Sequence, residues 1–276
     1  MDRYAVIGHP VSHSRSPWIH AQFARQTGQA LSYGMLDAAP EDFVGTVQAF
    51  FAGGGLGLNV TLPHKEAACA LAEVLAPAAR AAGAVNTLAL DDAGRLVGDN
   101  TDGVGLVRDI TGNLGWRIAG RRVLLAGAGG AARGVIAPLL AETPARLCIA
   151  NRTVARAETL VAHFGRPAGL EALGFDALAD EAPFDLLINA TSAGLAGEVP
   201  SLPDACLASG AACYDMLYGP GVTPFQRWAQ ARGVPAAQGL GMLVEQAAES
   251  FRLWRGVRPD TGPVLAQLRV LLTRPA

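Results

Sequence analysis

The sequence predicts an α/β fold in two domains, and three observations lead to this prediction. Short apolar segments of strand length alternate with segments whose apolar residues recur at helical spacing. A glycine-rich turn in the second half joins one such strand to a helix, an arrangement typical of dinucleotide binding. The length of 276 residues fits one large domain or two ordinary ones, and a hydrophobic content of 50% supplies ample core.

The first part of the chain alternates predicted strands and helices. Pro17 directly after Ser16 indicates a helix start with Ser16 as the N-cap. The expected strands cover residues 4–8, 31–36, 56–60, 83–88 and 95–98. The expected helices begin near residues 16, 41, 64 and 104. The carboxyl ends of strands are where open α/β sheets bind ligands, so polar residues after each strand are site candidates.

The second part repeats this alternation. We place a domain boundary near residues 102–105, before a glycine-containing break. The expected strands cover residues 123–126, 146–150, 185–189 and 211–216. The expected helices cover about 130–141 and 223–231, a long segment after Gly241, and 263–272. No internal repeat interrupts the pattern.

A glycine-rich turn follows the strand at 123–126. It has the spacing G-x-G-x-x-A, which gives a tight turn, close approach to a pyrophosphate and a helix N-terminus aimed at the anion. The residues expected to hold the cofactor here are Gly127, Ala128, Gly129, Gly130 and Ala131. A glycine match alone is weak, but a strand before it and a helix after it strengthen the prediction.

The residues after the next strand favour NADP over NAD. An NAD site places Asp or Glu there, to bind the ribose 2′-hydroxyl. Residues 151–156 contain no acid and include Arg152 and Arg156. Guanidinium groups bind a 2′-phosphate that a carboxylate would repel. The alternative, that both arginines are ordinary exposed helix residues, stays open.

Lys65 is the only lysine among 22 basic Lys and Arg residues. Arginine stays charged at any working pH, whereas a lysine amine can lose its proton in a suitable environment. A position that needs only positive charge would accept arginine, and a position that gives and takes a proton would not. We therefore interpret Lys65 as an acid–base candidate, with chance retention of one surface lysine as the alternative.

A polar run, Asp99-Asn100-Thr101-Asp102, lies between two glycines. Turn formation and helix capping explain one or two of these side chains but not four in a row. A lysine and an aspartate in one cleft would form a proton-handling pair. The hydroxyls of Ser14 and Ser16, near a helix start, suit a small anion such as a carboxylate.

The composition excludes several classes of function. The net charge is −2 with no basic cluster, so we expect no nucleic-acid partner. No apolar run reaches 18 residues, so we expect no membrane span, and the N-terminal apolar run is too short for a signal peptide. The cysteines are widely spaced and the histidines scattered, so we predict no metal and reduced thiols, as in a cytoplasmic protein.

Taken together, these motifs resemble the shikimate dehydrogenase family. The similarity extends nearly from end to end of the chain. The matching segments are residues 14–17, 59–65, 83–87, 98–103, 127–134, 151–153, 189–192, 214–216 and 239–246. The resemblance implies NADPH-dependent reduction of 3-dehydroshikimate to shikimate, in aromatic amino acid biosynthesis.

The resemblance also implies roles for individual residues. Lys65 and Asp102 match the catalytic pair. Implied contacts to the substrate come from Ser14, Ser16, Asn59, Thr61, Lys65, Asn86, Asp102, Tyr218 and Gln246. Implied contacts to NADP(H) come from residues 127–131, Asn151, Arg152, Thr153, Arg156, Thr191, Met216 and Gly239. From the residues alone, a buried core methionine is the commoner case for Met216, and a solvated helix glutamine is the alternative for Gln246.

The implied domains are discontinuous. Residues 1–103 and 240–276 would form the substrate domain, with the C-terminal helices returning to it, and residues 104–239 a Rossmann-type NADP domain. Two alternatives are a quinate/shikimate dehydrogenase that prefers NAD and a non-catalytic NADP-binding sensor. The expected partner is the small-molecule substrate, and the sequence leaves open whether the protein forms a homodimer.

Overall fold

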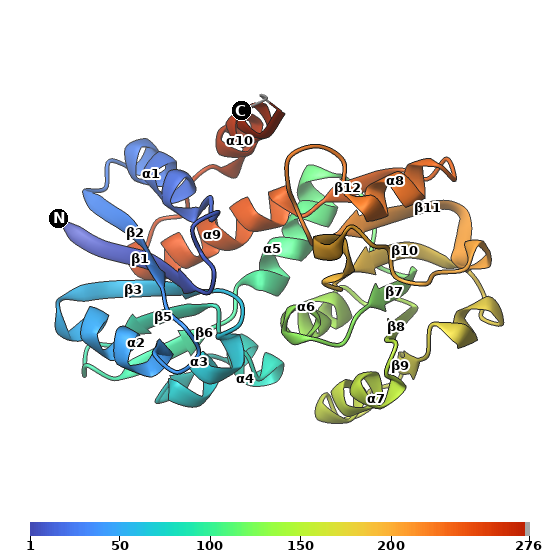
Figure 1. The fold of residues 1–276 in the computed structure, drawn as a ribbon, viewed down its shortest axis with the longest axis horizontal. Coiled ribbons are helices and arrows are strands. Elements are labelled where there is room, and N and C mark those ends of the chain that lie inside the picture. Colours follow the sequence, from blue (N-terminus) through green and yellow to red (C-terminus); the bar gives the residue numbers. More distant parts are fainter. Residues whose placement is uncertain (274–276) are drawn as a thin grey trace. The chain divides into compact units, whose positions relative to one another are not determined.

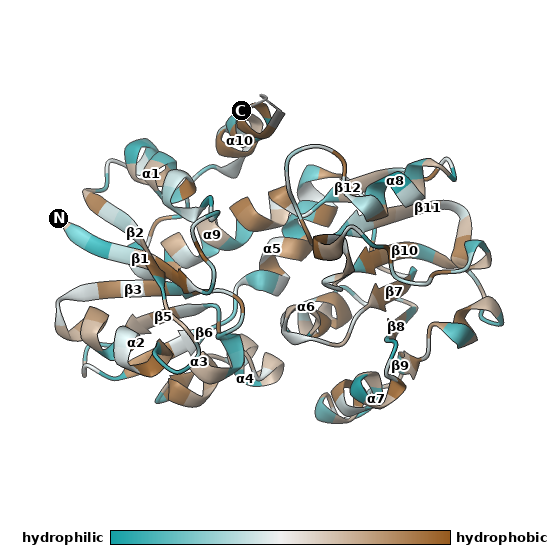
Figure 2. Cartoon of the chain, viewed as in Figure 1, coloured by the Kyte–Doolittle hydropathy of each residue, from teal (hydrophilic) through white to brown (hydrophobic). Residues whose placement is uncertain are grey.

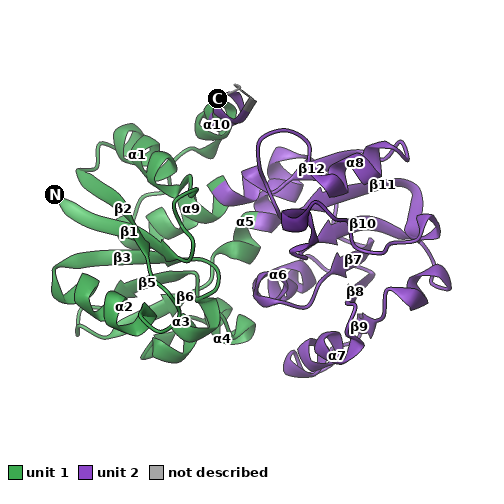
Figure 3. Cartoon of the chain, in the orientation of Figure 1, with its two compact units in different colours: residues 1–105, 244–267 green, residues 106–243, 268–276 purple. Residues whose placement is uncertain are grey.

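The computed structural model describes residues 1–273 and confirms the predicted α/β fold (Figure 1). Two six-stranded sheets carry the architecture. The chain divides into two compact units, one formed by residues 1–105 with 244–267 and the other by residues 106–243 with 268–273 (Figure 3). In both units hydrophobic segments occur in strands and on parts of the helices (Figure 2).

Unit 1 is built on a mixed sheet. Its strands are β1 (Asp2–Gly8), β2 (Leu31–Asp37), β3 (Gly55–Val60), β4 (Val74–Leu75), β5 (Thr87–Leu90) and β6 (Leu96–Asp99), in the order β2-β1-β3-β5-β6-β4. β1 pairs in parallel with β2 and β3. β5 runs antiparallel to both β3 and β6, so β6 runs in the same direction as β3.

Helices cover both faces of this sheet because successive side chains of its strands point to opposite faces, and both faces are apolar. Ala5 and Ile7 of β1 face one core, whereas Tyr4 stacks on Trp254 with ring centroids 4.9 Å apart. The helices of unit 1 are α1 (Ser16–Thr27), α2 (Phe43–Ala52), α3 (Lys65–Leu71) and α4 (Pro77–Ala82), with parts of α5 (Asp102–Arg108), α9 (Leu240–Arg255) and α10 (Thr261–Thr273).

The start of α1 differs from the prediction. Ser16 is the first helical residue, Arg15 takes the N-cap position, and no side chain caps the helix there. The hydroxyl oxygen of Ser14 instead accepts a hydrogen bond from the backbone nitrogen of Ser16 at 3.3 Å. The prediction that Ser16 is the N-cap is therefore wrong by one residue, because Arg15 already has helical backbone angles (φ −91°, ψ −4°) and the helix begins at Ser16.

An aromatic cluster fills the second face of the unit 1 sheet. The ring of His20 lies among the rings of Phe23, Tyr33, Phe251 and Trp254. His20 is almost fully buried, and among the described residues neither of its ring nitrogens has a hydrogen-bond partner. Burial therefore lowers the pKa of His20 to about 3, although the nearby Asn59 side chain acts in the opposite direction.

Unit 2 is built on a fully parallel sheet. Its strands are β7 (Arg122–Ala126), β8 (Arg146–Ala150), β9 (Leu170–Leu173), β10 (Phe184–Asn189), β11 (Leu207–Asp215) and β12 (Ala236–Gln238), in the order β12-β11-β10-β7-β8-β9. All five strand pairs are parallel. Every strand therefore ends at the same edge of the sheet, where α/β folds of this kind bind ligands.

Helices cover both faces of this sheet. Val123 and Leu125 face a core with α6 (Gly130–Ala141) and α7 (Val154–His163), whereas Leu124 faces the core that contains α8 (Pro224–Gln230). Short helical turns, η1 (Asp109–Asn113), η2 (Asp176–Ala179), η3 (Ala193–Ala196) and η4 (Asp204–Cys206), complete the unit. Parallel strands buried on both faces explain the continuous apolar runs in the sequence.

Candidate active site

The topology of unit 1 brings its candidate residues to one sheet edge. β1, β3 and β6 run in one direction and end at this edge, whereas the antiparallel β5 begins there. Residues that follow the first three strands and the residue before β5 therefore meet. This explains why Thr61, Asn86 and Asp102 converge although they lie far apart in the sequence.

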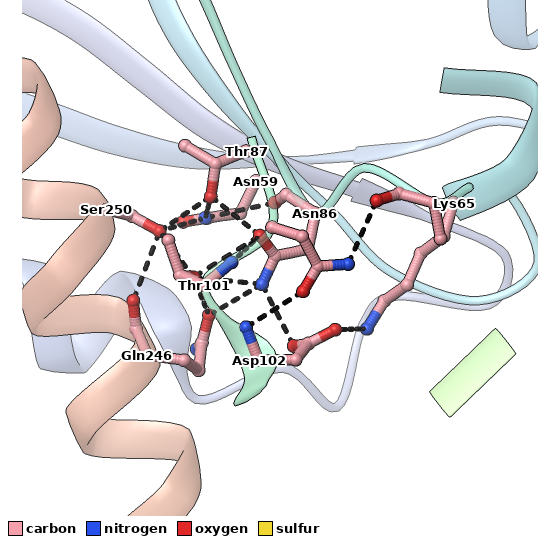
Figure 4. Close-up of polar contacts among 10 residues, drawn as sticks. Asn59, Lys65, Asn86, Thr87, Thr101, Asp102, Gln246 and Ser250 are labelled. Atoms are coloured by element: carbon pink, nitrogen blue, oxygen red, sulfur yellow. Dashed lines mark hydrogen bonds and ion pairs between the residues drawn. The ribbon is translucent and has the colours of Figure 1, made fainter. Parts of the chain in front are cut away.

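The central feature is an ion pair between Lys65 and Asp102 (Figure 4). Lys65 is the first residue of α3 and Asp102 the first residue of α5. The ammonium Nζ lies 2.6 Å from the carboxylate Oδ2, and the two side chains are 16% and 8% exposed. This burial limits solvent screening, so the pair is stronger than an exposed one while the ammonium remains accessible.

Asn86 connects this pair to a second set of side chains. Its amide Nδ2 donates to Asp102 Oδ1 at 2.9 Å and to Thr101 Oγ1 at 3.0 Å. Gln246 of α9 joins the group, with its Oε1 3.4 Å from both Asn86 Nδ2 and Thr101 Oγ1. The structure thus brings together four residues that the sequence singled out, namely Lys65, Asn86, Asp102 and Gln246.

Asn59 lies deeper, on the side of β3 that faces α9. Its Oδ1 accepts from the Tyr33 hydroxyl at 2.7 Å. Its Nδ2 lies 2.9 Å from Ser250 Oγ and 3.3 Å from Thr87 Oγ1. The Asn59 side chain is therefore hydrogen-bonded within unit 1, and its direct contact with substrate stays a prediction.

Ser14 and Thr61 lie on the loops that follow β1 and β3, and Ser16 is the first residue of α1. The β1 loop is anchored to the end of β2, where His9 Nδ1 lies 2.6 Å from Asp37 Oδ1. His9, and the Val11 backbone N–H, hold the pKa of the Asp37 carboxyl below its usual range. Ser16 is buried and Ser14 half-buried, so hydroxyl groups line this part of the sheet edge.

In unit 2 the glycine-rich turn connects β7 to α6, as the sequence predicted. Gly127 has a φ of +114°, a conformation that favours glycine, and a Cβ there would lie 3.0 Å from the backbone of Ala190. Gly129 is the N-cap of α6, and open space surrounds the Cβ positions of Gly129 and Gly130. This turn leaves room for a pyrophosphate beside backbone N–H groups, so it fits a dinucleotide.

The residues after β8 suit a phosphate. Arg152, Thr153 and Arg156 are exposed, and the Asn151 amide donates to the Thr153 carbonyl at 2.9 Å, which shapes the turn. Their position beside the glycine-rich turn follows from the parallel pairing of β7 and β8. These residues therefore fit the 2′-phosphate of NADP(H). The turn contains no Asp or Glu, the residue that binds the ribose 2′-hydroxyl in an NAD site.

The remaining candidates of unit 2 follow β10, β11 and β12 at the same edge. Thr191 N and Oγ1 both donate to Asn189 Oδ1, and the backbone nitrogen of Gly239 donates to the Leu217 carbonyl. A Cβ on Gly239 would collide with the backbone of Met216, so these two residues lie against each other. Tyr218 lies on the loop after β11, in unit 2, unlike the other substrate candidates.

Asp215 organises these loops from a fully buried position. Its carboxylate accepts from Asn189 Nδ2 at 3.1 Å, from Thr223 Oγ1 at 2.6 Å and from the Leu217 backbone nitrogen at 3.2 Å. Burial raises the pKa of Asp215, while these hydrogen bonds oppose the rise. Asp215 lay in the predicted strand and in the matching segment 214–216 but was given no role, although its position at the strand end was an available signal.

Several residues of unit 1 were also missed. Ser250, Thr87 and Tyr33 belong to the hydrogen-bonded cluster around Asn59. Thr87 stood inside a matching motif, whereas Ser250 and Tyr33 carry no local signature. Over residues 1–273, no His, Cys, Asp and Glu side chains group in a way that could hold a metal ion. In the same residues no helix is long and apolar enough to cross a membrane.

Fold and site together define a class of protein. It is an α/β protein in which one unit carries a dinucleotide-type turn and the other a buried lysine–aspartate pair. Three family descriptions match the sequence: "Shikimate dehydrogenase substrate binding domain" over residues 6–88, "Shikimate / quinate 5-dehydrogenase" over 107–196 and "Shikimate 5'-dehydrogenase C-terminal domain" over 239–269.

Individual relatives agree over their full length. The chain is 61% identical to the shikimate dehydrogenase (NADP(+)) of Alkalilimnicola ehrlichii, over 97% of this chain and 98% of that protein. It is 58% identical to the protein of the same name from Methylococcus capsulatus, over 97% and 96%. The chain belongs to the shikimate dehydrogenase family of NADP-dependent oxidoreductases, which confirms the predicted family.

Solved structures show the same fold. An Ael1 enzyme from Pseudomonas putida superposes with a TM-score of 0.92 at 46% identity, covering 100% of this chain and 99% of that one. Shikimate 5-dehydrogenase from Thermus thermophilus, solved with NADP(H) and shikimate, superposes with a TM-score of 0.87 at 36% identity, covering 98% and 99%. The two-unit architecture is thus that of enzymes in this family.

Proposed function

We propose that this protein catalyses the reversible reduction of 3-dehydroshikimate to shikimate with NADPH, as a step in aromatic amino acid biosynthesis. Unit 1 would bind the substrate and unit 2 the cofactor. The main observation behind this proposal is the ion pair at the carboxyl-end edge of the unit 1 sheet, in which Lys65 Nζ lies 2.6 Å from Asp102 Oδ2. Relatives that share most of the sequence carry the corresponding name.

The geometry supports different roles for Lys65 and Asp102. When bound, NADPH supplies the hydride that adds to the ring carbonyl carbon. The carbonyl oxygen then needs a proton, and the Lys65 ammonium is the group that gives it; in the reverse direction the neutral amine takes a proton from the hydroxyl. Asp102 holds the amine in place through Oδ2. A carboxylate has further lone pairs, so Asp102 also accepts a hydrogen bond from a ring hydroxyl.

The other residues orient the two reactants. We propose that Ser14 and Ser16 bind the substrate carboxylate, together with Tyr218 from unit 2, and that Thr61, Asn86 and Gln246 bind ring hydroxyls. The turn at 127–131 would hold the pyrophosphate, and residues 151–156 the 2′-phosphate. Thr191, Met216 and Gly239 would flank the nicotinamide, supported by their position at the carboxyl ends of β10, β11 and β12.

A rate measurement tests the function directly. We expect shikimate and NADP⁺ to give a rise in absorbance at the reduced-nicotinamide band. Parallel assays with NAD⁺ and with quinate separate this function from an NAD-preferring quinate/shikimate dehydrogenase. Folded protein that binds NADPH but turns over neither acid would support the non-catalytic sensor instead.

Two further proposals concern the cell and the assembly. We propose a cytoplasmic location, because all four cysteines are free thiols and three of them are buried. We also propose a homodimer through the edge strand β2, which among the described residues pairs with β1 alone and exposes Met35. Fractionation of cells tests the first, and light scattering during size-exclusion chromatography tests the second.

A further inference from the structure

Ser250 is a fully buried hydroxyl residue of α9 that lies among four polar groups. Its Oγ lies 2.8 Å from Thr87 Oγ1, 2.9 Å from Asn59 Nδ2 and 3.3 Å from Thr101 Oγ1. It also lies 3.2 Å from the Gln246 carbonyl one helical turn earlier. A helix serine commonly bonds only to that carbonyl, so the three other contacts require another explanation.

The orientation of Asn86 is fixed by this cluster. The backbone nitrogen of Thr101 can only donate, and it lies 2.8 Å from Asn86 Oδ1. The Thr87 hydroxyl lies 2.9 Å from the same oxygen. Because Oδ1 faces two donors, the amide nitrogen must face the other way, where it donates to Asp102 Oδ1 at 2.9 Å. Asn86 thus fixes the rotation of the carboxylate that holds Lys65.

Figure 4 shows the hydrogen bonds that join these side chains, and the donors among them decide the direction of each bond. An amide nitrogen donates but does not accept, so Ser250 must accept from Asn59 Nδ2. Of the acceptors then available to the Ser250 proton, Thr87 is the nearest at 2.8 Å, a normal O–H···O distance. The Thr87 proton is then directed to Asn86 Oδ1. At the far end, the Tyr33 hydroxyl orients Asn59 by donating to its Oδ1.

We propose that Ser250 is a positioning residue for the Lys65–Asp102 pair, acting through Thr87 and Asn86. Asn59 and Tyr33 would serve the same purpose from inside unit 1. This inference rests on the proposed function, since it assumes that the pair handles the proton. Without the Ser250 hydroxyl, Thr87 loses a donor and Asn59 an acceptor, so the amide of Asn86 and the carboxylate of Asp102 gain rotational freedom.

The first test is the substitution Ser250→Ala, measured with shikimate and saturating NADP⁺. A net hydrogen bond is equivalent to roughly a threefold to tenfold change in rate, and we expect kcat to fall by about that factor. The pH profile of kcat should change, whereas the dissociation constant of NADPH should not. Val47→Ala is the matched control, because it removes buried apolar contacts from unit 1 but no hydrogen bond of the cluster.

A second pair of variants covers the case in which Ser250→Ala does not fold. Thr87→Val removes the hydroxyl, whereas Thr87→Ser retains it. We expect Thr87→Ser to keep a wild-type pH profile and Thr87→Val to lose it. In the double variant Ser250→Ala/Thr87→Val the losses should be less than additive, since both residues act through Asn86. Equal kinetics for the two Thr87 variants would overturn the inference.

The single lysine provides a measurement that needs no turnover. Labelling with ε-¹³C-lysine gives one NMR signal, from Lys65 alone. We expect Ser250→Ala to change the position and pH response of this signal and Val47→Ala to leave both unchanged. An unaltered signal in Ser250→Ala would refute the positioning role even in an inactive protein. A wild-type chain that does not oxidise shikimate would instead overturn the proposed function, so the two failures are distinguishable.

Discussion

The imidazole of His20 stacks on the phenol ring of Tyr33, with ring centroids 4.2 Å apart and planes tilted by 8°. This stacking buries a titratable group among aromatic rings. Because burial lowers the pKa of His20 to about 3 from an ordinary value of 6.5, the folded chain keeps this ring neutral in mildly acidic solution, whereas the unfolded chain protonates it.

The first prediction concerns stability against pH. Between pH 6.5 and 3 the unfolded state binds one proton more at His20 than the folded state, so the free energy of unfolding falls as the pH falls. The slope from this residue approaches about 1.4 kcal/mol per pH unit. Urea unfolding of the wild type and of His20→Phe at several pH values measures it. The two slopes should differ by roughly this amount, and parallel curves would contradict the assignment.

The second prediction concerns the chemistry of Lys65. Lys65→Ala should lower kcat by about 10²–10⁴-fold, the usual loss for a general acid–base group, with little change in NADPH affinity. Lys65→Arg is the matched control, because it keeps a positive charge beside Asp102 but does not release a proton at working pH. Both variants should be slow. An active Lys65→Arg would assign the residue an electrostatic role only.

The third prediction concerns cofactor choice. Arg152→Gln should raise KM for NADP⁺ by roughly tenfold to a hundredfold, the equivalent of one or two charged hydrogen bonds. KM for NAD⁺ should change less than about twofold, since NAD⁺ lacks the 2′-phosphate. Arg25→Gln removes the same charge from α1 of unit 1 and serves as the control. Equal effects of Arg152→Gln on both cofactors would exclude a specific phosphate contact.

The fourth prediction separates two glycines of one turn. Gly127→Ala places a Cβ against the Ala190 backbone at a φ of +114°, so it should lower the free energy of unfolding by about 1–3 kcal/mol. Gly129→Ala meets open space in the protein alone, so it should fold normally but bind NADPH more weakly, because the methyl group takes the room of the pyrophosphate. Thermal unfolding and NADPH titration of both variants distinguish the two effects.

Sequence patterns predicted the long elements well because their causes are local. The strand at 146–150 has the predicted bounds, and the helix after the glycine-rich turn ends at Ala141 as expected. The strand expected from residue 83 begins only at Thr87. Val85 and Asn86 instead donate to the carbonyls of Lys65 and Asp99. These partners are more than ten residues away in the sequence, so a local pattern does not reveal them. The apolar composition of residues 83–88 alone predicted that the strand begins at residue 83.

The candidate site was predictable only where a motif carries its own chemistry. A single lysine or a glycine-rich turn is visible in the sequence itself. Ser250 is one small polar residue on a mainly apolar helix, and its importance arises from Asn59 and Thr87, which β3 and β5 bring to it. The π-helical turn η1 was likewise missed, because Asp109 there is bound by the hydroxyl of Tyr214, about a hundred residues later.

The discontinuity of unit 1 has a consequence for synthesis on the ribosome. Ser250 and Gln246 belong to unit 1, yet they are translated only after residues 106–243, which form the core of unit 2. At a translation rate of about 5–20 residues per second, α9 is synthesised on the order of ten seconds after the strands of unit 1. During that interval the lysine–aspartate pair already has Asn86 beside it but lacks Gln246 and Ser250, so the polar cluster around the pair is completed last.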